Sequence, residues 1–460
     1  KETIRSHAAK IVDAIGPPAA CFPCILNGLA RMLTAEKGTA HHFAMQAARK
    51  MGAAAAGHRS FVSVIADLLT HENHRTRSNA ADIAGYIGRD LAHNTEILEL
   101  LGALVSDDDK HVQISAVRAI GKIGLSTVEM EKTILEVASL LRSDDGDIRS
   151  SSVIAIEDIG EFAGTKKFLY LISKLLINTR GDALQDVTFA IRAIGPASAT
   201  PEILSAICEI LIDPERSTYA ANCLSRMGAN AETPEILEVI ARTHCSPEKR
   251  VRQAGVKAAS MVGPAAVTED FLSVVAEMLQ ETDEQTRRNG YWAVERVGPY
   301  AATDKFLNIL SKLLTSPRHG VVEAALHSVK AIGPKAATDN VISKIPHLLR
   351  QDYSTLPLLA CSAVTTMGVA ACTPKVLSCL AALLGHPDGF NRRSAINTIS
   401  RIGSFAAKDP LIMEALFRMD KRFKKEVLFN ISFRWAFIRI FYRQPIESWV
   451  GYTIGELTTE

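Results

Sequence analysis

Apolar residues recur along this chain with the spacing of a helix face, and each series ends at a glycine. Before Gly124, apolar or small residues stand one, four, five and eight positions back, at Ile123, Ile120, Ala119 and Ala116. This spacing places the four side chains on one face of an α-helix. The glycine predicts the helix end, because a residue without Cβ adopts the left-handed C′ conformation at little cost.

The same pattern returns twelve times at an almost constant interval of 33 to 36 residues. The glycines that end the twelve series are Gly16, Gly52, Gly88, Gly124, Gly160, Gly195, Gly228, Gly263, Gly298, Gly333, Gly368 and Gly403. Such a period is typical of a stacked-repeat protein. Repeat proteins of this kind offer an extended surface, so the period favours a binding function over catalysis.

A second helix is predicted in each unit after a short link. In seven units a threonine stands five positions after the glycine, as in Thr200 and Thr303, and proline follows several of these threonines. Threonine is a good N-cap, and proline is preferred at the first helical position. Each unit is therefore expected to be a pair of antiparallel helices. Such a pair cannot bury its apolar face alone and requires stacking on its neighbours.

The glycine-ended helix also carries charged residues at fixed places. An arginine stands eleven positions before the glycine in six units, as at Arg77 and Arg287, and an acidic residue stands fifteen positions before it in five units, as at Asp109. In this pattern the chain resembles the HEAT repeat family across residues 1–416. The resemblance implies an all-α fold, a right-handed α-α superhelical solenoid of about twelve HEAT-like helical hairpins. It also implies charge pairs between neighbouring units.

Some units depart from this pattern. The arginine position is held by Leu184, Ser217, Val322 and Pro357. We expect the charge pairing to be interrupted there, and we expect Pro357 to delay the start of its helix. Units of 35 residues are short for HEAT and armadillo repeats, and the pattern of tetratricopeptide repeats, whose length is closer, is absent.

The last segment of the chain breaks the period. Ten of the 27 aromatic residues lie in residues 417–460, and basic residues outnumber acidic ones there. We divide the chain into a HEAT-like solenoid, 1–416, and an atypical C-terminal segment, 417–460. This aromatic, basic segment is expected to be a C-terminal cap that seals the last open interface. Docking on a partner and contact with a membrane surface are the alternatives.

Composition adds limits on the compartment and on partners. The net charge is only +2, so no general affinity for polyanions is indicated. The eight cysteines are scattered, which favours a reducing compartment and a cytoplasmic location. Because the chain begins at Lys1 without methionine, we expect it to be a fragment from which targeting segments are missing. No apolar run has the length of a transmembrane helix.

Candidate catalytic and metal-binding motifs are few. Cys21 and Cys24 form a C-x-x-C, but Cys21 stands at an N-cap position and Cys24 at the first expected core position, so we interpret both as structural. The pair His71 and His74 lies in a polar link and is interpreted as solvated. HEAT-repeat di-iron hydroxylases carry several His-Glu pairs, and this chain has one. We therefore expect no catalytic residue, no bound metal and no cofactor, and we predict that the chain is not an enzyme.

The exposed side of the glycine-ended helices is the candidate site. In HEAT-like solenoids this helix lines the concave face, and the resemblance implies the same here. Positions two, three, six, nine and ten before the glycine should be exposed on it. In the second half of the chain the predicted partner-binding residues are Arg192, Tyr219, Asn222, Arg226, Lys257, Arg288, Asn289, Trp292, Arg296, His327, Lys330, Arg393, Asn397 and Arg401. Acidic residues on the same positions are fewer, so the groove is expected to be basic.

These patterns lead to one main hypothesis and one alternative. The main hypothesis is a non-enzymatic protein-binding scaffold or adaptor, whose concave face holds protein or peptide partners that are acidic or extended. The alternative is a nucleic-acid-binding protein that uses the same basic groove, as HEAT-like DNA glycosylases do. The low net charge and the acidic residues on the same face argue against this alternative. An enzyme of the HEAT-like lyase or hydroxylase kind is disfavoured, because no ligand motif is present.

Overall fold

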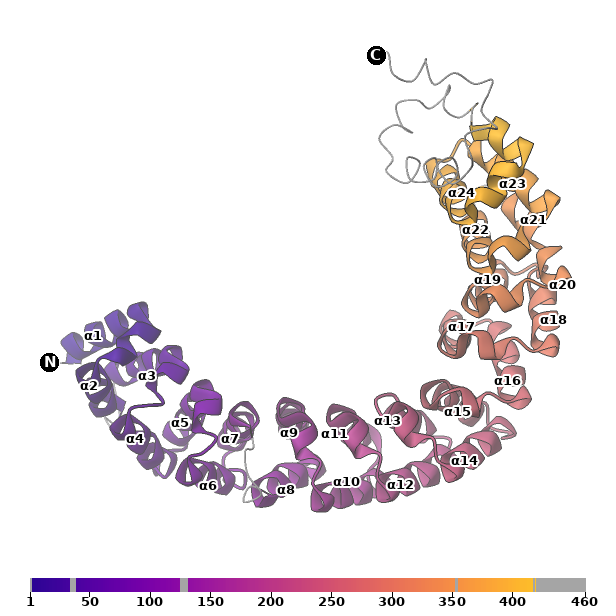
Figure 1. Ribbon diagram of the computed structural model, residues 1–460. Coiled ribbons are helices and arrows are strands. Elements are labelled where there is room, and N and C mark those ends of the chain that lie inside the picture. The colour runs from indigo at the N-terminus through magenta and orange to yellow at the C-terminus, as the bar shows by residue number, and fades with distance from the viewer. Residues whose placement is uncertain (1, 34–38, 125–130, 352–354, 417, 419–460) are drawn as a thin grey trace, which may run out of the picture. The chain divides into compact units, whose positions relative to one another are not determined.

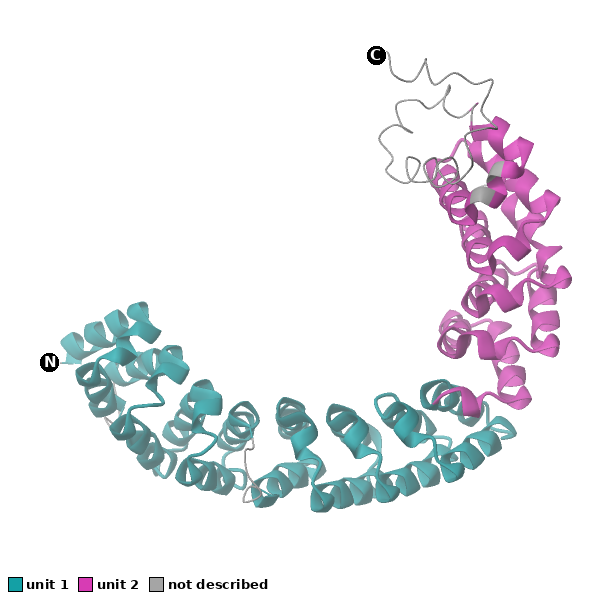
Figure 2. Ribbon diagram, viewed as in Figure 1, with its two compact units in different colours: residues 1–262 teal, residues 263–460 magenta. Residues whose placement is uncertain are grey.

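The computed structural model describes residues 2–33, 39–124, 131–351, 355–416 and 418. Throughout this described part the regular structure is helical and no strand occurs. The chain forms two compact units, unit 1 (residues 1–262) and unit 2 (residues 263–460), which are coloured separately in Figure 2. The segment 417–460, for which a cap, a docking site or a membrane contact was predicted, lies outside the described residues except for residue 418.

Unit 1 is a stack of antiparallel helix pairs (Figure 1). Its helices are α1 (Glu2–Ile15), α2 (Pro23–Leu33), α3 (Thr39–Met51), α4 (Arg59–Leu69), α5 (His74–Ile87), α6 (Thr95–Leu104), α7 (Lys110–Ile123), α8 (Glu131–Ser139), α9 (Gly146–Ile159), α10 (Lys166–Asn178), α11 (Gly181–Ile194), α12 (Pro201–Leu211), α13 (Ser217–Leu224), α14 (Pro234–His244) and α15 (Lys249–Val262). The odd-numbered helices pack side by side in one layer, and the even-numbered helices form the other.

Unit 2 repeats the same two-layer arrangement. Its helices are α16 (Glu269–Leu279), α17 (Glu284–Val297), α18 (Asp304–Leu313), α19 (His319–Ile332), α20 (Asp339–Ile342), α21 (Ile345–Leu349), α22 (Leu356–Met367), α23 (Pro374–Leu384) and α24 (Gly389–Ile402). The glycine-ended helices α17, α19, α22 and α24 follow one another in one layer, and α16, α18, α20, α21 and α23 form the other. The helical solenoid expected from the period is thus the fold of the described chain.

The periodic glycines end their helices as predicted. All twelve have a positive φ, between 48° and 143°. Gly88 illustrates the reason: its φ is 67°, and its amide donates to the carbonyl of Ala84, which closes the last turn of α5. A short 3-10 turn follows each of these glycines except Gly124, after which residues are not described. This turn brings the chain to the threonine that starts the second helix.

Six of the seven predicted threonine caps are present. Thr200, for example, stands before α12, and its hydroxyl accepts a hydrogen bond from the amide of Ile203 at 3.5 Å. Thr338 is the exception, because its side chain makes no capping hydrogen bond and the helix after it, α20, is only four residues long. Pro346 lies near the start of α21 and interrupts what is one helix in the other units.

Two glycine-ended helices start later than the others. Pro357 delays its helix as predicted, since α22 begins at Leu356, twelve positions before Gly368, where other units begin fourteen positions before. Helix α13 has only eight residues and begins at Ser217. This helix lies in the shortest interval between periodic glycines, the 33 residues from Gly195 to Gly228, so less chain is left for it.

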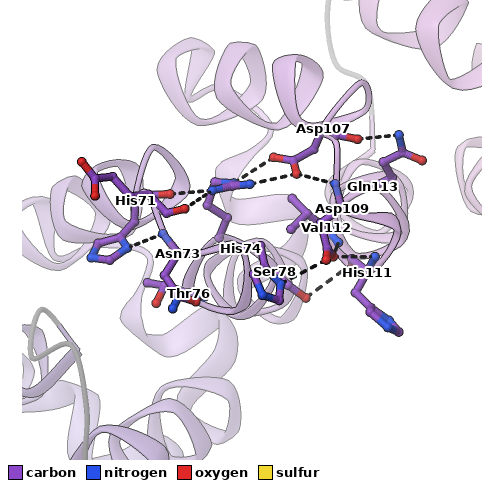
Figure 3. A network of polar contacts seen from close by, with 12 residues as sticks. His71, Asn73, His74, Thr76, Ser78, Asp107, Asp109, His111, Val112 and Gln113 are labelled. Carbon is purple, nitrogen blue, oxygen red and sulfur yellow. Dashed lines mark hydrogen bonds and ion pairs between the residues drawn. The ribbon is translucent and has the colours of Figure 1, made fainter.

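The recurring arginine clamps the link that precedes its own helix. Nη1 of Arg77 donates to the carbonyls of His71 and Glu72 at 2.8 Å each. The rest of the guanidinium binds Asp107 of the next unit through two parallel bonds of 2.8 and 2.9 Å. Asp107 also accepts a hydrogen bond from the amide of Asp109 at 2.9 Å (Figure 3). Arg77 therefore binds both the link before its own helix and a carboxylate of the next repeat.

The recurring acidic residue caps its own helix and also pairs with a basic residue of the preceding repeat, as the resemblance implied for neighbouring repeats. Asp109 caps its own helix α7 by accepting the amides of His111 and Val112. It also pairs with His74 of the preceding unit, with 3.1 Å between Asp109 Oδ2 and the His74 Nδ1. Ion pairs thus join neighbouring helical repeats within unit 1. In these pairs Arg77 binds Asp107, and Asp109 binds His74.

One repeat without the arginine has another donor to its own link. Gln113 stands at the arginine position of its repeat and donates to the carbonyl of Asp107 at 2.6 Å. In the repeat with Val322 at that position, Arg318 donates instead to the carbonyl of Gln280, in the link of the preceding repeat, at 2.5 Å. Val322 is apolar and buried, so the pairing of the recurring arginine is interrupted in this repeat, as predicted.

Candidate partner-binding surface

The residues predicted for partner binding lie on the solvent-exposed side of the glycine-ended helices or in the turns that follow them. None of the predicted set is buried; each is exposed or half-buried. Those from Arg192 to Lys257 belong to unit 1 and those from Arg288 to Arg401 to unit 2. We describe the two groups separately, as two surfaces.

The unit 1 patch lies on α11, α13 and α15. Lys257 Nζ of α15 donates a hydrogen bond to Oδ1 of Asn222 on α13, so the two predicted residues meet across neighbouring helices. Arg192 of α11 lies over the exposed ring of Phe189, 5.7 Å from the ring centroid. Tyr219 is half-buried. The patch therefore combines cations with aromatic surface.

Arg226 differs from the sequence-based expectation. It was placed on a helix that runs to Gly228, but α13 ends at Leu224, and Arg226 lies in the turn that follows. The amide of Met227 donates to the carbonyl of Leu224, a bond that tightens this turn. Arg226 stays exposed there, so the residue remains available to a partner although its helical placement was wrong.

Acidic side chains do not offset the cations on α13 and α15. Neither helix contains an Asp or Glu in its sequence. On α11, Asp186 is bound by Arg149 of the preceding unit with a distance of 2.8 Å between Nε and Oδ2, and both side chains are largely buried. Arg250 adds a further exposed cation on α15, thirteen positions before Gly263, whereas the exposed acids Asp182 and Glu215 hold the same position in the two preceding repeats. The basic part of the unit 1 patch is therefore α15 together with Arg226 in the turn after α13.

The unit 2 patch is centred on α17 and α19. The Tyr291 ring stacks on His327 of the next helix, with centroids 4.5 Å apart and planes 14° from parallel. The rings of Trp292 and Tyr291 pack edge to face, with their centroids 6.3 Å apart, and Trp292 is 46% exposed. The guanidinium of Arg288 lies 5.9 Å from the Trp292 ring centroid. An aromatic cluster with one exposed indole thus joins two neighbouring repeats of unit 2, through α17 and α19.

The charges of the unit 2 patch cancel. Its cations are Arg288, Arg296 and Lys330, and the carboxylates on the same two helices are Glu284, Glu295 and Glu323. Arg288 pairs with Glu284 at 2.6 Å, and Glu323 lies 3.5 Å from His319. The unit 2 patch therefore offers aromatic area and polar groups such as Asn289 rather than net charge.

The remaining predicted residues stand apart from the unit 2 patch. Arg393, Asn397 and Arg401 are exposed on α24. Helix α22 lies between α24 and α19, and its sequence contains no charged residue. The structure therefore does not bring the α24 residues together with the Trp292 cluster.

His327 is expected to titrate below its ordinary pKa. Burial lowers the pKa of His327 from 6.5, the charge of Lys330 lowers it further, and Glu323 and Glu295 oppose the shift. Since the folded pKa is depressed, neutral His327 stabilises the fold fully above pH 6.5, and this contribution is lost as the pH falls below that value. A proton NMR titration should give a midpoint below 6.5 that rises in Lys330→Met. A midpoint at or above the ordinary value would contradict this environment.

The residues set aside as structural have defined positions. Cys21 and Cys24 are both exposed, so placing Cys24 in the core was wrong; the first buried residue of α2 is Leu26. His71 accepts the amide of Asn73, and His74 binds Asp109, as Figure 3 shows. Among the described residues, no group of three or more His, Cys, Asp or Glu side chains could hold a metal ion. No helix of this part of the chain is long and apolar enough to cross a membrane.

Three surface residues were missed by the sequence-based reasoning. Phe189 is 40% exposed and stands six positions before Gly195, the same position that Trp292 holds in its unit. Tyr291 is half-buried and joins α17 to α19. Arg250 stands one turn before the positions that were considered. Continuing the helix face back by one turn would have found Arg250, and allowing apolar residues at the exposed positions would have found Phe189.

A comparison with known protein families identifies one match. Residues 64–157 match the model described as HEAT repeats. This range runs from α4 to α9 and includes the Arg77 clamp. No curated protein matches the sequence of this chain.

Several solved structures share the fold. Kap95p in complex with RanGDP is 12% identical with a TM-score of 0.64, and the match covers 90% of this chain and 62% of that one. Kap121p bound to Ste12p is 14% identical with a TM-score of 0.61, over 91% and 49% of the two chains. The karyopherin Kap121p bound to the extreme C-terminus of the protein phosphatase Cdc14p is 15% identical with a TM-score of 0.57, over 90% and 45%. The chain thus spans about half to three fifths of the length of these proteins.

Proposed function

Because this chain is a helical solenoid of HEAT repeats, we propose that it is a protein-binding scaffold without catalytic activity, which holds partner segments on its glycine-ended helices. A solenoid offers each partner a row of side chains at a regular spacing, which suits extended segments. Several of the similar structures hold protein partners, among them the extreme C-terminus of a phosphatase. This precedent in the fold supports the proposal and does not identify a partner.

The partner of the unit 1 patch is proposed to be acidic. The observation that supports this proposal is the combination of exposed or half-buried Arg226, Arg250 and Lys257 with the absence of any carboxylate on α13 and α15. On α11, Asp186 is already bound by Arg149, and Asp182 is exposed at the start of the helix. A basic surface of this kind attracts carboxylates and speeds their association.

The unit 2 patch is proposed to anchor an apolar or aromatic residue of the partner. Trp292 presents an exposed ring, and Tyr291 and His327 hold its surroundings in place by stacking. Tryptophan and arginine are the residue types that contribute most to binding at interfaces. Because the charges of this patch cancel, its contribution should depend little on salt.

The proposal is tested with labelled peptides in fluorescence anisotropy. We expect a short Asp- and Glu-rich peptide to bind the chain, and the variant Arg226→Ala/Arg250→Ala/Lys257→Ala to weaken binding by at least about tenfold. The matched control is Lys166→Ala/Lys312→Ala/Lys375→Ala, which removes three exposed cations from α10, α18 and α23, the helices of the other layer. Equal losses in both variants would mean that only total charge matters, and would contradict a site on α13 and α15.

The unit 2 patch has its own test. In a series of acidic peptides, one that also carries an aromatic or leucine residue should bind more tightly, and Arg288→Ala/Trp292→Ala/Arg296→Ala should abolish that gain. Nucleic acid is the competing outcome for both patches. If a DNA duplex binds at about 0.1 M salt and its affinity falls steeply as salt rises, while no acidic peptide binds, the scaffold proposal is replaced by nucleic-acid binding.

A further inference from the structure

Equivalent positions of five successive repeats form one row across α7, α9, α11, α13 and α15 of unit 1. The residues that stand six positions before the periodic glycines of these repeats are Arg118, Ile154, Phe189, Asn222 and Lys257. Each of them is exposed or half-buried. The five helices pack side by side in this order (Figure 1). Across these helices the row has a cation at each end and apolar side chains between the ends.

The α7 end of the row is basic. Helix α7 contains no Asp or Glu, and Arg118 and Lys122 are exposed on it. Lys122 Nζ lies 4.6 Å from the ring centroid of Tyr86 on α5, so this end also offers an exposed aromatic ring. The acid of α5, Asp82, is bound by Arg49 at 2.6 Å. We name Arg118 and Lys122 the α7 cluster, because no carboxylate of α7 itself offsets their charge.

The α15 end of the row is the basic part of the unit 1 patch. Lys257 lies at this end and donates to Asn222, the row residue of α13. Arg250 is exposed on the same helix, and Arg226 is exposed in the turn after α13. Neither α13 nor α15 contains an acid. We name Arg226, Arg250 and Lys257 the α15 cluster.

The middle of the row is apolar and is bordered by acids. Ile154 is 44% exposed and Phe189 is 40% exposed, on neighbouring helices. Large apolar side chains that stay exposed next to each other mark a contact site. The same two helices also expose Glu157, Asp158 and Asp182. Like charges that face each other at an interface are unfavourable, so acids of a partner fit at the two clusters and not between them.

The distance between the clusters fixes the spacing of the partner's acids. Four helix-to-helix steps lead from α7 to α15. Packed helices lie about 8–10 Å apart, so the two ends of the row are about 36 Å apart. An extended chain rises about 3.3 Å per residue and covers this distance with about eleven residues.

We propose that this row binds one extended segment of a partner protein, which carries an acidic group at each end and an apolar residue between them. This segment is the acidic partner of the proposed function, on which the inference rests, and its site now extends from the α15 cluster to the α7 cluster. Its acids form two groups about eleven residues apart instead of one run. Because both groups belong to one chain, binding of the first raises the effective concentration of the second at its cluster.

Two labelled peptides of identical composition test this arrangement in fluorescence anisotropy. The divided peptide has a group of Glu residues at each end, with about eleven residues between the group centres and a leucine midway. The joined peptide has the same residues with all Glu residues together at one end. On the unmodified chain the divided peptide should bind at least about tenfold more tightly, because it alone engages both clusters without bringing acids to Glu157 and Asp158.

Three variants locate the parts of the row. Arg118→Ala/Lys122→Ala should remove the advantage of the divided peptide and leave the affinity for the joined peptide unchanged. The matched control Lys132→Ala/Lys166→Ala removes two exposed cations from α8 and α10, in the other layer of unit 1, and should preserve the advantage. Phe189→Ser should weaken the divided peptide severalfold, and this effect should vanish when the leucine of the peptide is replaced by serine.

The comparison of the two peptides on the unmodified chain decides the matter without any variant. Equal affinities would overturn the inference, and binding of the joined peptide at the α15 cluster would still leave the proposed function standing. If neither peptide binds, the acidic partner of the proposed function and the row are rejected together. If the control removes the advantage as fully as Arg118→Ala/Lys122→Ala does, only total charge matters and the row is rejected. A DNA duplex that binds more tightly than either peptide at about 0.1 M salt would make nucleic acid the occupant, which would also overturn the inference.

Discussion

Replacing Gly121 by leucine should destabilise the contact between α7 and α9 by about 3 kcal/mol, the upper part of the range for overpacked cores. The reason is the approach of the two backbones, because even a Cβ at this position would lie 2.7 Å from Cα of Ala155. A backbone atom cannot move aside as the end of a flexible side chain can. Gly121→Ala should also destabilise, although alanine is favoured over glycine inside a helix by about 1 kcal/mol.

The measurement combines urea unfolding with hydrogen exchange of α7 and α9. Exchange is needed because each unit contacts only its neighbours, so a local loss of stability need not change the whole chain equally. The matched control is Gly28→Ala in α2, where an added Cβ would meet nothing within 4 Å. This control should be neutral or stabilising. A gain in stability for Gly121→Ala as well would show that α7 and α9 are not packed as closely as described.

Removing the side chain of Arg77 should cost about 3 kcal/mol of local stability, because it leaves the carboxylate of Asp107 largely buried without its cation. The side chains of Arg77 and Asp107 are 18% and 8% exposed. Arg77→Ala also frees the carbonyls of His71 and Glu72, so the link before α5 should exchange its amides faster. Arg77→Lys should recover only part of the loss, since an ammonium cannot form the two parallel bonds to the carboxylate.

A double-mutant cycle with Asp107→Asn checks this prediction, and the pair should show a coupling energy of more than about 1 kcal/mol. The control is Lys132→Ala, which breaks an exposed pair with Glu136 at 3.7 Å and should leave stability within experimental error. If Arg77→Ala were as mild as this control, the clamp would not contribute to stability.

The same pair predicts a dependence on pH. Burial raises the pKa of Asp107, but the hydrogen bonds from Arg77 and from the Asp109 amide, together with the charge of Arg77, outweigh burial and hold the pKa below its ordinary value of 3.8. The stabilisation is therefore fully present above that value and is lost as the pH falls through the folded pKa. The difference in stability between the unmodified chain and Asp107→Asn should shrink in acid. A difference that grows in acid would contradict the pairing.

Much of the local structure could be predicted from the sequence. The glycine period placed the end of the glycine-ended helices, and the positive φ of those glycines confirms the reason for it. The delayed start of α22 followed from Pro357 alone. These features depend on the conformations open to one residue and its near neighbours, so the order of residues determines them.

The roles of the charged residues could not be predicted in the same way. The period showed that an arginine recurs, but its acceptors are carbonyls of a link and, at Arg77 and Arg149, a carboxylate of the next unit. The bond from Arg318 to the carbonyl of Gln280, in the link of the preceding repeat, was not predicted either. Such contacts depend on how far one helix is displaced along its neighbour, which the spacing within a unit does not specify.

The candidate surface divides along the same line. The sequence by itself determined that the chain is an array of helical hairpins and which side of each glycine-ended helix is exposed, because helix periodicity and glycine conformation are local properties. The tertiary structure decided which side chains of different repeats are in contact. It stacked Tyr291 on His327 and paired Asp186 with Arg149. These arrangements arise only when neighbouring units pack, since side chains about 35 residues apart meet through the register of the stack.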